Sequence, residues 1–217
     1  MIEKKELVKK KLVIFDLDGT LVDTLEDVVT SLNEALTVYN YQGVTKDYVK
    51  GYLGYGGNTL VSSILKFEEK HLVNEINNIY LEKYQKNLLN NTVLYPGVQN
   101  TLDYLENLDI KMAICTNKKS KFTWEIIEEL KIEKYFEIVV SGDTLVDKKP
   151  SGIPLSYIFN KLSIEKVNTV MVGDTEIDYK SAISADIEFI YANYGYGEIL
   201  KSLNKVNNFK ELLNYFK

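Results

Sequence analysis

The sequence predicts an α/β fold: a doubly wound, Rossmann-like parallel sheet with a small all-helical domain inserted after the first strand. Two observations lead to this prediction. Short apolar runs alternate with helical patterns along most of the chain, which is typical of a parallel sheet covered by helices. Between residues 24 and 94, by contrast, every apolar pattern has helical spacing. We therefore expect residues 1–23 and 95–217 to form an α/β core and residues 24–94 to form a helical cap over the strand ends.

Five short apolar runs bounded by turn residues are the expected strands. In chain order they are Leu12–Phe15, Met112–Cys115, Ile138–Val140, Thr169–Val172 and Ile187–Tyr191. Apolar residues at helical spacing predict core helices over Val98–Leu108, Lys121–Leu130, Ile153–Leu162 and Asp178–Ala185, and a closing amphipathic helix over Lys205–Lys217. In the insert the same spacing, interrupted by glycines, predicts helices over Leu25–Val38, Asn58–Leu65 and His71–Leu89.

Composition limits the partners and the location of the protein. Hydrophobic residues make up 45% of the 217 residues and charged residues 26%, which is typical of a globular protein. The net charge of −5 argues against nucleic acid as a partner, because neutralising phosphates requires a basic face. One cysteine excludes an internal disulfide and suits a reducing compartment, and no stretch approaches the ~20 apolar residues of a membrane span. We expect a cytoplasmic protein, monomeric or homodimeric, with no nucleic-acid or membrane partner.

Two acids directly follow the first expected strand. Asp16 and Asp18 are separated by one residue and are followed by Gly19 and Thr20. The strand delivers them to the carboxyl edge of the sheet, where open α/β sheets bind their ligands. Aspartate also favours turns, but neighbouring carboxylates repel each other and resist burial, so stability alone does not explain the pair. A divalent cation would remove the repulsion, and a nucleophile with a proton donor would use both acids.

Three further polar clusters lie beyond strands that are expected to end at the same edge. They are Thr116-Asn117, Lys149-Pro150, and Gly173-Asp174 with Asp178 four residues later. A role in helix capping is the alternative interpretation for Thr116-Asn117 and for Asp178. In a parallel sheet these loops converge, so four carboxylates, a lysine, a hydroxyl and an amide would meet as a cation site beside an anion site.

Phosphoryl transfer is the chemistry that fits these groups. Mg²⁺ prefers oxygen ligands, and Asp16, Asp174 and a backbone carbonyl would bind it, with direct or indirect support from Asp178. Lys149 and Thr116 would hold the non-transferred phosphate oxygens. One carboxylate would attack phosphorus to form an aspartyl-phosphate. The other would protonate the leaving alcohol and later deprotonate water.

In order along the chain, the four clusters resemble the four motifs of the haloacid dehalogenase-like superfamily. Asp16-Leu17-Asp18-Gly19-Thr20 resembles the first motif, DxDGT, and the stretch from Gly173 to Asp178 resembles the fourth, GDxxxD. Thr116-Asn117 resembles the second motif and Lys149-Pro150 the third, so that the resemblance covers essentially the whole chain. It implies that Asp16 is the nucleophile and Asp18 the general acid and base. It also implies Mg²⁺ on Asp16, the Asp18 carbonyl and Asp174, and a helical cap of the C1 type.

Within the superfamily the chain is most similar to phosphoglycolate phosphatases. The resemblance rests on three short stretches, Leu53-Gly54-Tyr55-Gly56, Tyr95-Pro96-Gly97-Val98 and Tyr194-Gly195-Tyr196-Gly197. It implies a Mg²⁺-dependent phosphatase acting on a small phosphorylated metabolite, for preference 2-phosphoglycolate. Asn117, Thr116 and Lys149 would contact the substrate. Gly54 and Gly56 either break the cap helices or bring backbone amides to the substrate.

One position departs from the pattern of this group. Gly152 stands where the group has the second proline of Lys-Pro-x-Pro, and we expect it to loosen the loop that carries Lys149.

Other activities remain open at this point. A β-phosphoglucomutase-like enzyme would return the phosphoryl group to a sugar, and a pyrophosphatase-like enzyme would cleave a phosphoanhydride on the same core. A phospho-acceptor module like a response-regulator receiver also combines an aspartate, Mg²⁺, a threonine and a lysine. Such modules are shorter and lack a helical insert, and their acceptor lies on a later strand.

Overall fold

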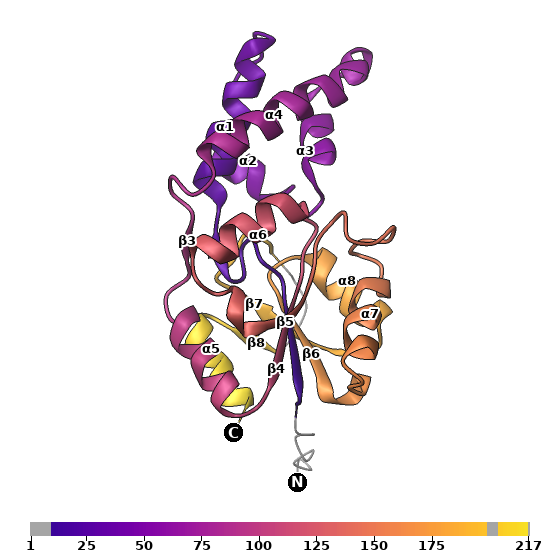
Figure 1. Cartoon of the computed structure of the whole chain (residues 1–217). Helices are drawn as coiled ribbons and strands as arrows, with labels where there is room; N and C mark the ends of the chain where they lie inside the picture. The colour runs from indigo at the N-terminus through magenta and orange to yellow at the C-terminus, as the bar shows by residue number, and fades with distance from the viewer. Residues whose placement is uncertain (1–9, 199–203, 217) are drawn as a thin grey trace.

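The computed structural model describes residues 10–198 and 204–216 and confirms the expected α/β class (Figure 1). Six parallel strands form one sheet in the order β5-β4-β1-β6-β7-β8. β1 therefore lies inside the sheet, and its carboxyl end opens onto the middle of one sheet edge. The strand bounds are β1 Leu12–Phe15, β4 Lys111–Cys115, β5 Phe136–Val140, β6 Thr169–Gly173, β7 Glu188–Ala192 and β8 Lys205–Val206.

The side chains of β1 alternate between two apolar layers, because successive residues of a strand point to opposite faces. Val13 and Phe15 pack into one layer, and Leu12 and Ile14 pack into the other. Helices cover both layers, which is why all four side chains are fully buried (Figure 1). The first layer is covered by α5 Val98–Asn107, α6 Ser120–Glu129 and η4 Phe209–Tyr215, and the second by α7 Ile153–Lys161 and α8 Glu176–Ser184.

Residues 24–92 are mostly helical and lie over the carboxyl ends of the strands (Figure 1). A short antiparallel ribbon of β2 Val22–Asp23 and β3 Val93–Leu94 marks where this insert leaves and rejoins the core. One apolar layer continues from the insert into the core, so the division into two domains at residues 24 and 94 remains our prediction. The helices of the insert are α1 Leu25–Val38, α2 Lys46–Lys50, α3 Gly57–Ile64, η1 Phe67–Leu72 and α4 Val73–Asn87.

Two expected helices differ from the structure. The segment expected as one helix over Lys205–Lys217 forms β8 and then the short 3-10 helix η4, and residue 217 lies outside the described residues. Val206 is buried and pairs with β7, so this segment extends the sheet before it covers one face. The helix expected over His71–Leu89 begins as η1 and continues as α4, which ends at Asn87.

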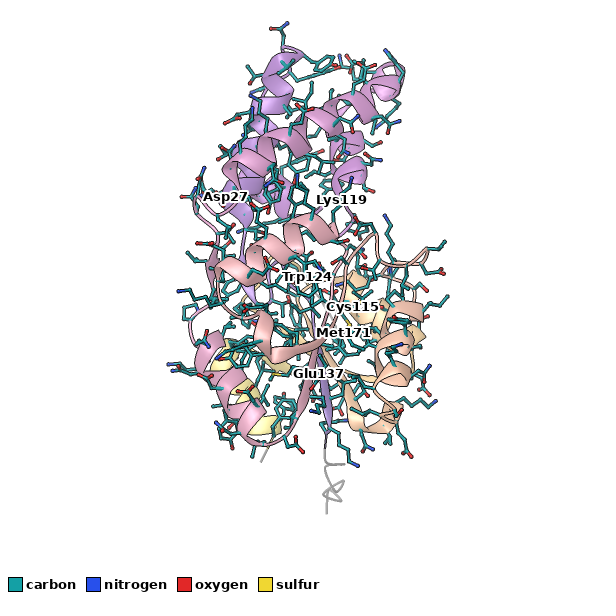
Figure 2. All side chains as sticks on the ribbon, in the orientation of Figure 1. Asp27, Cys115, Lys119, Trp124, Glu137 and Met171 are labelled. Carbon is teal, nitrogen blue, oxygen red and sulfur yellow. The ribbon has the colours of Figure 1, made fainter. Side chains whose placement is uncertain are left out.

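Cys115 is buried at the end of β4, and burial raises the pKa of its thiol to about 12. Trp124 of α6 keeps 43% of its surface exposed (Figure 2). Among the described residues, no helix combines the length and the apolar character needed to cross a lipid bilayer.

Candidate active site

Asp16 is the first residue after β1 and lies buried at the carboxyl edge of the sheet. Its backbone N–H donates to the carbonyl of Val172 at 2.9 Å, which ties it to the neighbouring strand β6. Its carboxylate Oδ1 accepts a hydrogen bond from the Leu17 N–H at 2.7 Å. Because β1 is flanked by β4 and β6, Asp16 lies between the loops that follow those two strands.

Asp174 and Asp178 meet Asp16 at this edge. One carboxylate oxygen from each of the three residues lies within 4.8 Å of the other two, and all three side chains are buried. Thr20 Oγ1 donates to Asp174 Oδ1 at 3.1 Å, and the Tyr196 N–H donates to Asp174 Oδ2 at 2.8 Å. The structure therefore brings together carboxylates from distant parts of the chain, since Asp16 directly follows β1 and Asp178 lies in α8, more than 150 residues later.

Asp178 also fixes the start of α8. Its Oδ2 accepts hydrogen bonds from the Thr175 N–H at 3.0 Å and the Thr175 hydroxyl at 2.6 Å. The Asp178 N–H donates to Thr175 Oγ1 at 3.4 Å, which completes a reciprocal capping box. The helix thus begins at Glu176, two residues before the expected start, and Thr175 rather than Asp178 is its N-cap.

Lys149 supplies the positive charge of the cluster. Its Nζ lies 2.8 Å from Asp16 Oδ1 and 2.5 Å from Asp178 Oδ1, and only 2% of its side chain is exposed. Burial by itself would lower the pKa of Lys149, but the charges of Asp16 and Asp178 raise it above its usual range. The lysine is therefore charged, and it lies beside the acids as the sequence predicts.

The cluster holds three buried carboxylates and one buried ammonium, so it is short of positive charge. Burial, reinforced by Asp178, raises the pKa of Asp16 to about 7 in spite of Lys149. Burial and the charges of Asp178 and Asp16 also raise the pKa of Asp174. A divalent cation would relieve this repulsion, and carboxylate oxygens facing a common centre are the ligands that Mg²⁺ prefers. The residues of the cluster therefore fit a Mg²⁺ ion.

Two glycines let the backbone pass close to Asp174. Gly19 has φ +80°, and a Cβ at this position would overlap the Asp174 carboxylate. A Cβ at Gly195 would overlap both the Asp174 side chain and the Gly19 carbonyl. A side chain at either position would therefore displace Asp174 from the cluster.

Asp18 lies beside this cluster, and its side chain faces other partners. Its carboxylate accepts a hydrogen bond from Thr24 Oγ1 at 2.6 Å. Lys118 Nζ lies 2.9 and 3.2 Å from the two Asp18 oxygens and donates to the Tyr84 hydroxyl of α4 at 2.7 Å. Sequence reasoning missed Lys118, although it directly follows Thr116-Asn117.

Thr116 and Asn117 occupy the loop between Asp18 and Lys149. Thr116 is buried, and its Oγ1 accepts the Lys118 N–H at 3.2 Å. Asn117 Nδ2 donates to the Gly54 carbonyl at 2.7 Å and to the Lys149 carbonyl at 2.8 Å, so one amide joins the helical insert to the lysine loop. Among the described residues, Asn117 Oδ1 is buried without a hydrogen-bond donor, which leaves it able to accept one from a ligand.

A cavity of about 250 Å³ separates the strand ends from the helical insert. Asp16, Asp18 and Thr116 line it on the core side. Gly54 and Gly56, with φ of +88° and +92°, line it on the side of the insert. The expected substrate-facing glycines are thus at a cavity, and their role in binding remains our prediction.

Lys148 is exposed and also lines the cavity. Its Nζ would lie 3.9 Å from a Cβ at Gly56. This lysine therefore stands at the mouth of the cavity, between the lysine loop and the insert.

Tyr196 connects the acidic cluster to the base of the insert. Besides the contact of its N–H with Asp174, its hydroxyl accepts from the Thr24 N–H at 2.7 Å and donates to Asp23 Oδ1 at 2.8 Å. The sequence marked Tyr196 only as part of a short resemblance, because no local pattern reveals contacts made 172 residues apart.

The loop that carries Lys149 is held firmly at Gly152, contrary to the expected loosening. The Gly152 N–H donates to Ser184 Oγ at 3.1 Å, and Ser181 Oγ donates to the Ser151 carbonyl at 2.7 Å. A Cβ at Gly152 would lie 2.5 Å from the backbone nitrogen of Ala185. The glycine therefore allows the loop to pack against the end of α8.

The fold and the site together indicate the class of the protein: a Rossmann-like α/β enzyme whose candidate active site lies at the carboxyl edge of its sheet beneath a helical insert. Residues 13–192 match the haloacid dehalogenase-like hydrolase family. The chain belongs to this family, as the four motifs imply. It is an enzyme rather than a receiver-like signalling module, and within the family it groups with phosphoric monoester hydrolases.

Similar curated proteins carry one name. The chain is 35% identical over 198 residues to a phosphoglycolate phosphatase of Colwellia psychrerythraea, and the alignment covers 88% of each protein. It is 31% identical over 215 residues to a phosphoglycolate phosphatase of Chromobacterium violaceum, with 95% of this chain and 96% of the relative covered.

Solved structures agree on the fold. A crystal structure from Haemophilus somnus, described as a predicted phosphoglycolate phosphatase, superposes with a TM-score of 0.89 at 28% identity and covers 97% of this chain and all of its own. A structure from Lactobacillus delbrueckii, described as a putative phosphoglycolate phosphatase, has a TM-score of 0.87 at 22% identity over 96% of this chain and 99% of its own. The second likeness is one of fold alone.

Proposed function

We propose that this chain is a Mg²⁺-dependent phosphatase that hydrolyses a small phosphomonoester through an aspartyl-phosphate on Asp16, with 2-phosphoglycolate as the preferred substrate. The observation that carries the proposal is the buried cluster of Asp16, Asp174 and Asp178, with the Lys149 ammonium in contact with Asp16 and Asp178. The substrate preference is supported by the names of the similar curated proteins.

The residues that would hold the ion and the substrate follow from the cluster. Asp16, Asp174 and the Asp18 carbonyl would bind Mg²⁺, with Asp178 in support. When bound, the ion would supply positive charge that neutralises the transferring phosphoryl group and the carboxylates beside it. Lys149 would add a second positive charge, and Thr116 a hydroxyl, to the non-transferred phosphate oxygens.

In the first step, one Asp16 carboxylate oxygen would attack phosphorus while the bond from phosphorus to the leaving-group oxygen breaks. Asp18 would give its proton to that oxygen, so that the product leaves as a neutral alcohol. Asp16 would then carry the phosphoryl group as a mixed anhydride.

In the second step, Asp18, now a carboxylate, would take a proton from a water molecule as the water oxygen attacks phosphorus. The bond from phosphorus to the Asp16 oxygen would break and release inorganic phosphate. Both acids would return to their starting states. The helical insert would cover the cavity during these steps and limit the access of bulk water.

A steady-state assay of phosphate release tests the proposal. We expect release from 2-phosphoglycolate with Mg²⁺, and loss of that release with EDTA or in Asp16→Asn, which keeps the shape of the side chain and removes its charge. Pyrophosphate and β-glucose 1-phosphate belong in the same assay, because turnover of either in preference to 2-phosphoglycolate would contradict the proposed substrate. Undiminished turnover by Asp16→Asn would contradict the mechanism.

A further inference from the structure

The cavity receives its positive charge from one side only. None of the described residues that line it from the helical insert carries a charge. The sequence contains no arginine, so every side-chain cation apart from its one histidine is a lysine. The lysines that line the cavity are Lys118, Lys119 and Lys148, and all three belong to loops of the core.

Lys118 differs from the other two because its ammonium is buried. Only 8% of its side chain is exposed, whereas Lys119 and Lys148 are both exposed residues. Its Nζ contacts Asp18 at 2.9 Å and the Tyr84 hydroxyl at 2.7 Å, and it lies 4.7 Å from the centre of the Tyr84 ring. The ammonium is thus fixed between the proposed general acid of the core and a helix of the insert.

An ammonium group has three N–H donors. Within the described part of the structure, the two Asp18 oxygens accept from Lys118 Nζ at 2.9 and 3.2 Å, and the Tyr84 hydroxyl accepts at 2.7 Å. The 3.2 Å contact is the longest of the three and goes to a carboxylate that the 2.9 Å contact already pairs with the ammonium. This N–H can therefore turn to a ligand in the cavity that Lys118 lines.

The position of Lys118 also fixes which part of a substrate it can reach. The proposed function has Asp18 hand its proton to the leaving-group oxygen, so that oxygen must come to the Asp18 carboxylate. A carboxylate attached one carbon away from the same oxygen would then come within reach of the ammonium that already contacts Asp18.

We propose that Lys118 is a specificity-determining residue that selects phosphoesters whose leaving group carries its own carboxylate. This inference rests on the proposed phosphatase function and deepens it, because it assigns the recognition of the second negative charge to the core rather than to the insert. Lys118 would turn the N–H of its 3.2 Å contact to the substrate carboxylate, and Asp18 Oδ1 and the Tyr84 hydroxyl would hold the ammonium in place. Charge-assisted hydrogen bonds of this kind are about twice as strong as neutral ones.

A matched pair of substrates separates this role from a general effect on Asp18. Ethyl phosphate resembles 2-phosphoglycolate in size but has a methyl group in place of the carboxylate. Loss of Lys118 would disturb Asp18 equally for both substrates, whereas loss of carboxylate recognition would affect 2-phosphoglycolate alone. The ratio of the two kcat/KM values is therefore the diagnostic quantity.

The experiment measures this ratio in the wild type, Lys118→Met, Lys118→Arg and the control Lys121→Met, all with Mg²⁺. Lys121 is an exposed residue of α6 that does not line the cavity. We expect the wild type to prefer 2-phosphoglycolate, and the ratio to fall about tenfold to a hundredfold in Lys118→Met. Lys118→Arg should retain most of the preference because it keeps the charge, and Lys121→Met should match the wild type.

Three results would overturn the inference. If the wild type hydrolysed both esters equally well, the phosphatase proposal would stand, but recognition of the substrate carboxylate by Lys118 would be contradicted. Both kcat/KM values could fall by the same factor in Lys118→Met, which would make Lys118 a positioning residue for Asp18. If the folded wild type released phosphate from neither ester, the result would contradict the proposed function itself. Turnover of ethyl phosphate also reports whether Lys118→Met is folded.

Discussion

At the scale of single residues, the site is governed by a shortage of positive charge. Asp16, Asp174 and Asp178 are buried together, only Asp16 and Asp178 contact the Lys149 ammonium, and burial raises the pKa of both Asp16 and Asp174. A protein does not gain stability from such a group of acids unless a cation joins them. The arrangement is therefore better explained by what it binds than by what it contributes to folding.

Lys149→Met should expose this charge imbalance. Removing the ammonium leaves Asp16 and Asp178 buried without their shared partner, and loss of one member of a buried ion pair costs about 3–5 kcal/mol. We expect a lower free energy of unfolding in EDTA, measured by urea denaturation, and partial recovery with Mg²⁺. The exposed neighbour is the control, since Lys148→Met should change the unfolding free energy by less than about 0.5 kcal/mol. Equal stability of the Lys149→Met variant and the wild type in EDTA would contradict this account of the cluster.

Asp16 also predicts how the stability of the metal-free protein depends on pH. The pKa of Asp16 is about 7 in the folded protein, whereas the ordinary value for an aspartate is 3.8. Between these two pH values the folded state therefore binds more protons than the unfolded state. The free energy of unfolding therefore falls as the pH rises through this window. The loss of stability caused by ionising the buried Asp16 is complete above pH 7. In EDTA, the thermal midpoint of the wild type should fall more between pH 5 and pH 8 than that of Asp16→Asn. Identical slopes for the two proteins would show that Asp16 is not the titrating group.

The residue scale also shows what the sequence can and cannot reveal. Asp16 and Asp174 follow apolar strands, and a parallel sheet brings the ends of such strands together, so their meeting follows from pattern alone. Lys118 gives no comparable signal, because a lysine in a polar loop looks the same whether it is solvated or buried. Its role depends on Tyr84, which a separate helix of the insert supplies.

At the scale of secondary-structure elements, Asp27 ties the helical insert to its return linker. It lies on α1 near the base of the insert and is almost fully buried (Figure 2). Its carboxylate accepts hydrogen bonds from the N–H groups of Asn91 at 3.0 Å and Thr92 at 2.9 Å, and from the Thr92 hydroxyl at 2.7 Å. The two connections between insert and core are therefore joined to each other through one side chain.

Asp27→Ala should loosen this junction. The backbone N–H groups of Asn91 and Thr92 would lose a charged acceptor, and hydrogen bonds to charged groups contribute about 1.5–3 kcal/mol each. We expect the free energy of unfolding in urea to fall by about 2–4 kcal/mol, with the neighbouring, more exposed Glu26→Ala changing it by about 1 kcal/mol or less. A change in Asp27→Ala no larger than in the control would contradict the role given to this residue.

The boundaries of a helix or strand can be predicted where a single sequence pattern covers the whole element. Leu25–Val38 was expected as a helix and is observed as α1, because its apolar spacing and its length agree. The end of the chain shows the limit of that reasoning. The pattern over residues 205–217 is compatible with a helix, but Val206 instead pairs with β7, and pairing with a distant strand leaves no periodic trace in two residues.

At the scale of the whole molecule, the loops of the sheet and the helical insert line the same cavity and contact each other around it. Asn117 of the core donates to the Gly54 carbonyl of the insert, and Lys118 reaches the Tyr84 hydroxyl of α4. The same loop after β4 thus contacts the Lys149 carbonyl and Asp18 of the core as well as the insert. The parallel sheet and the helical character of the insert could be predicted from the sequence, because they depend on repeating apolar patterns. These cross-contacts could not, because each depends on how the insert sits on the core.

The central claim is that Asp16 carries the phosphoryl group during turnover. The most direct measurement is rapid acid quenching of the enzyme with 2-phosphoglycolate and Mg²⁺, followed by mass spectrometry of its peptides to locate covalently bound phosphate. The account predicts one phosphoryl group on Asp16 in the wild type and none on any residue of Asp16→Asn. Phosphate attached to a different residue, or full turnover by Asp16→Asn, would contradict it.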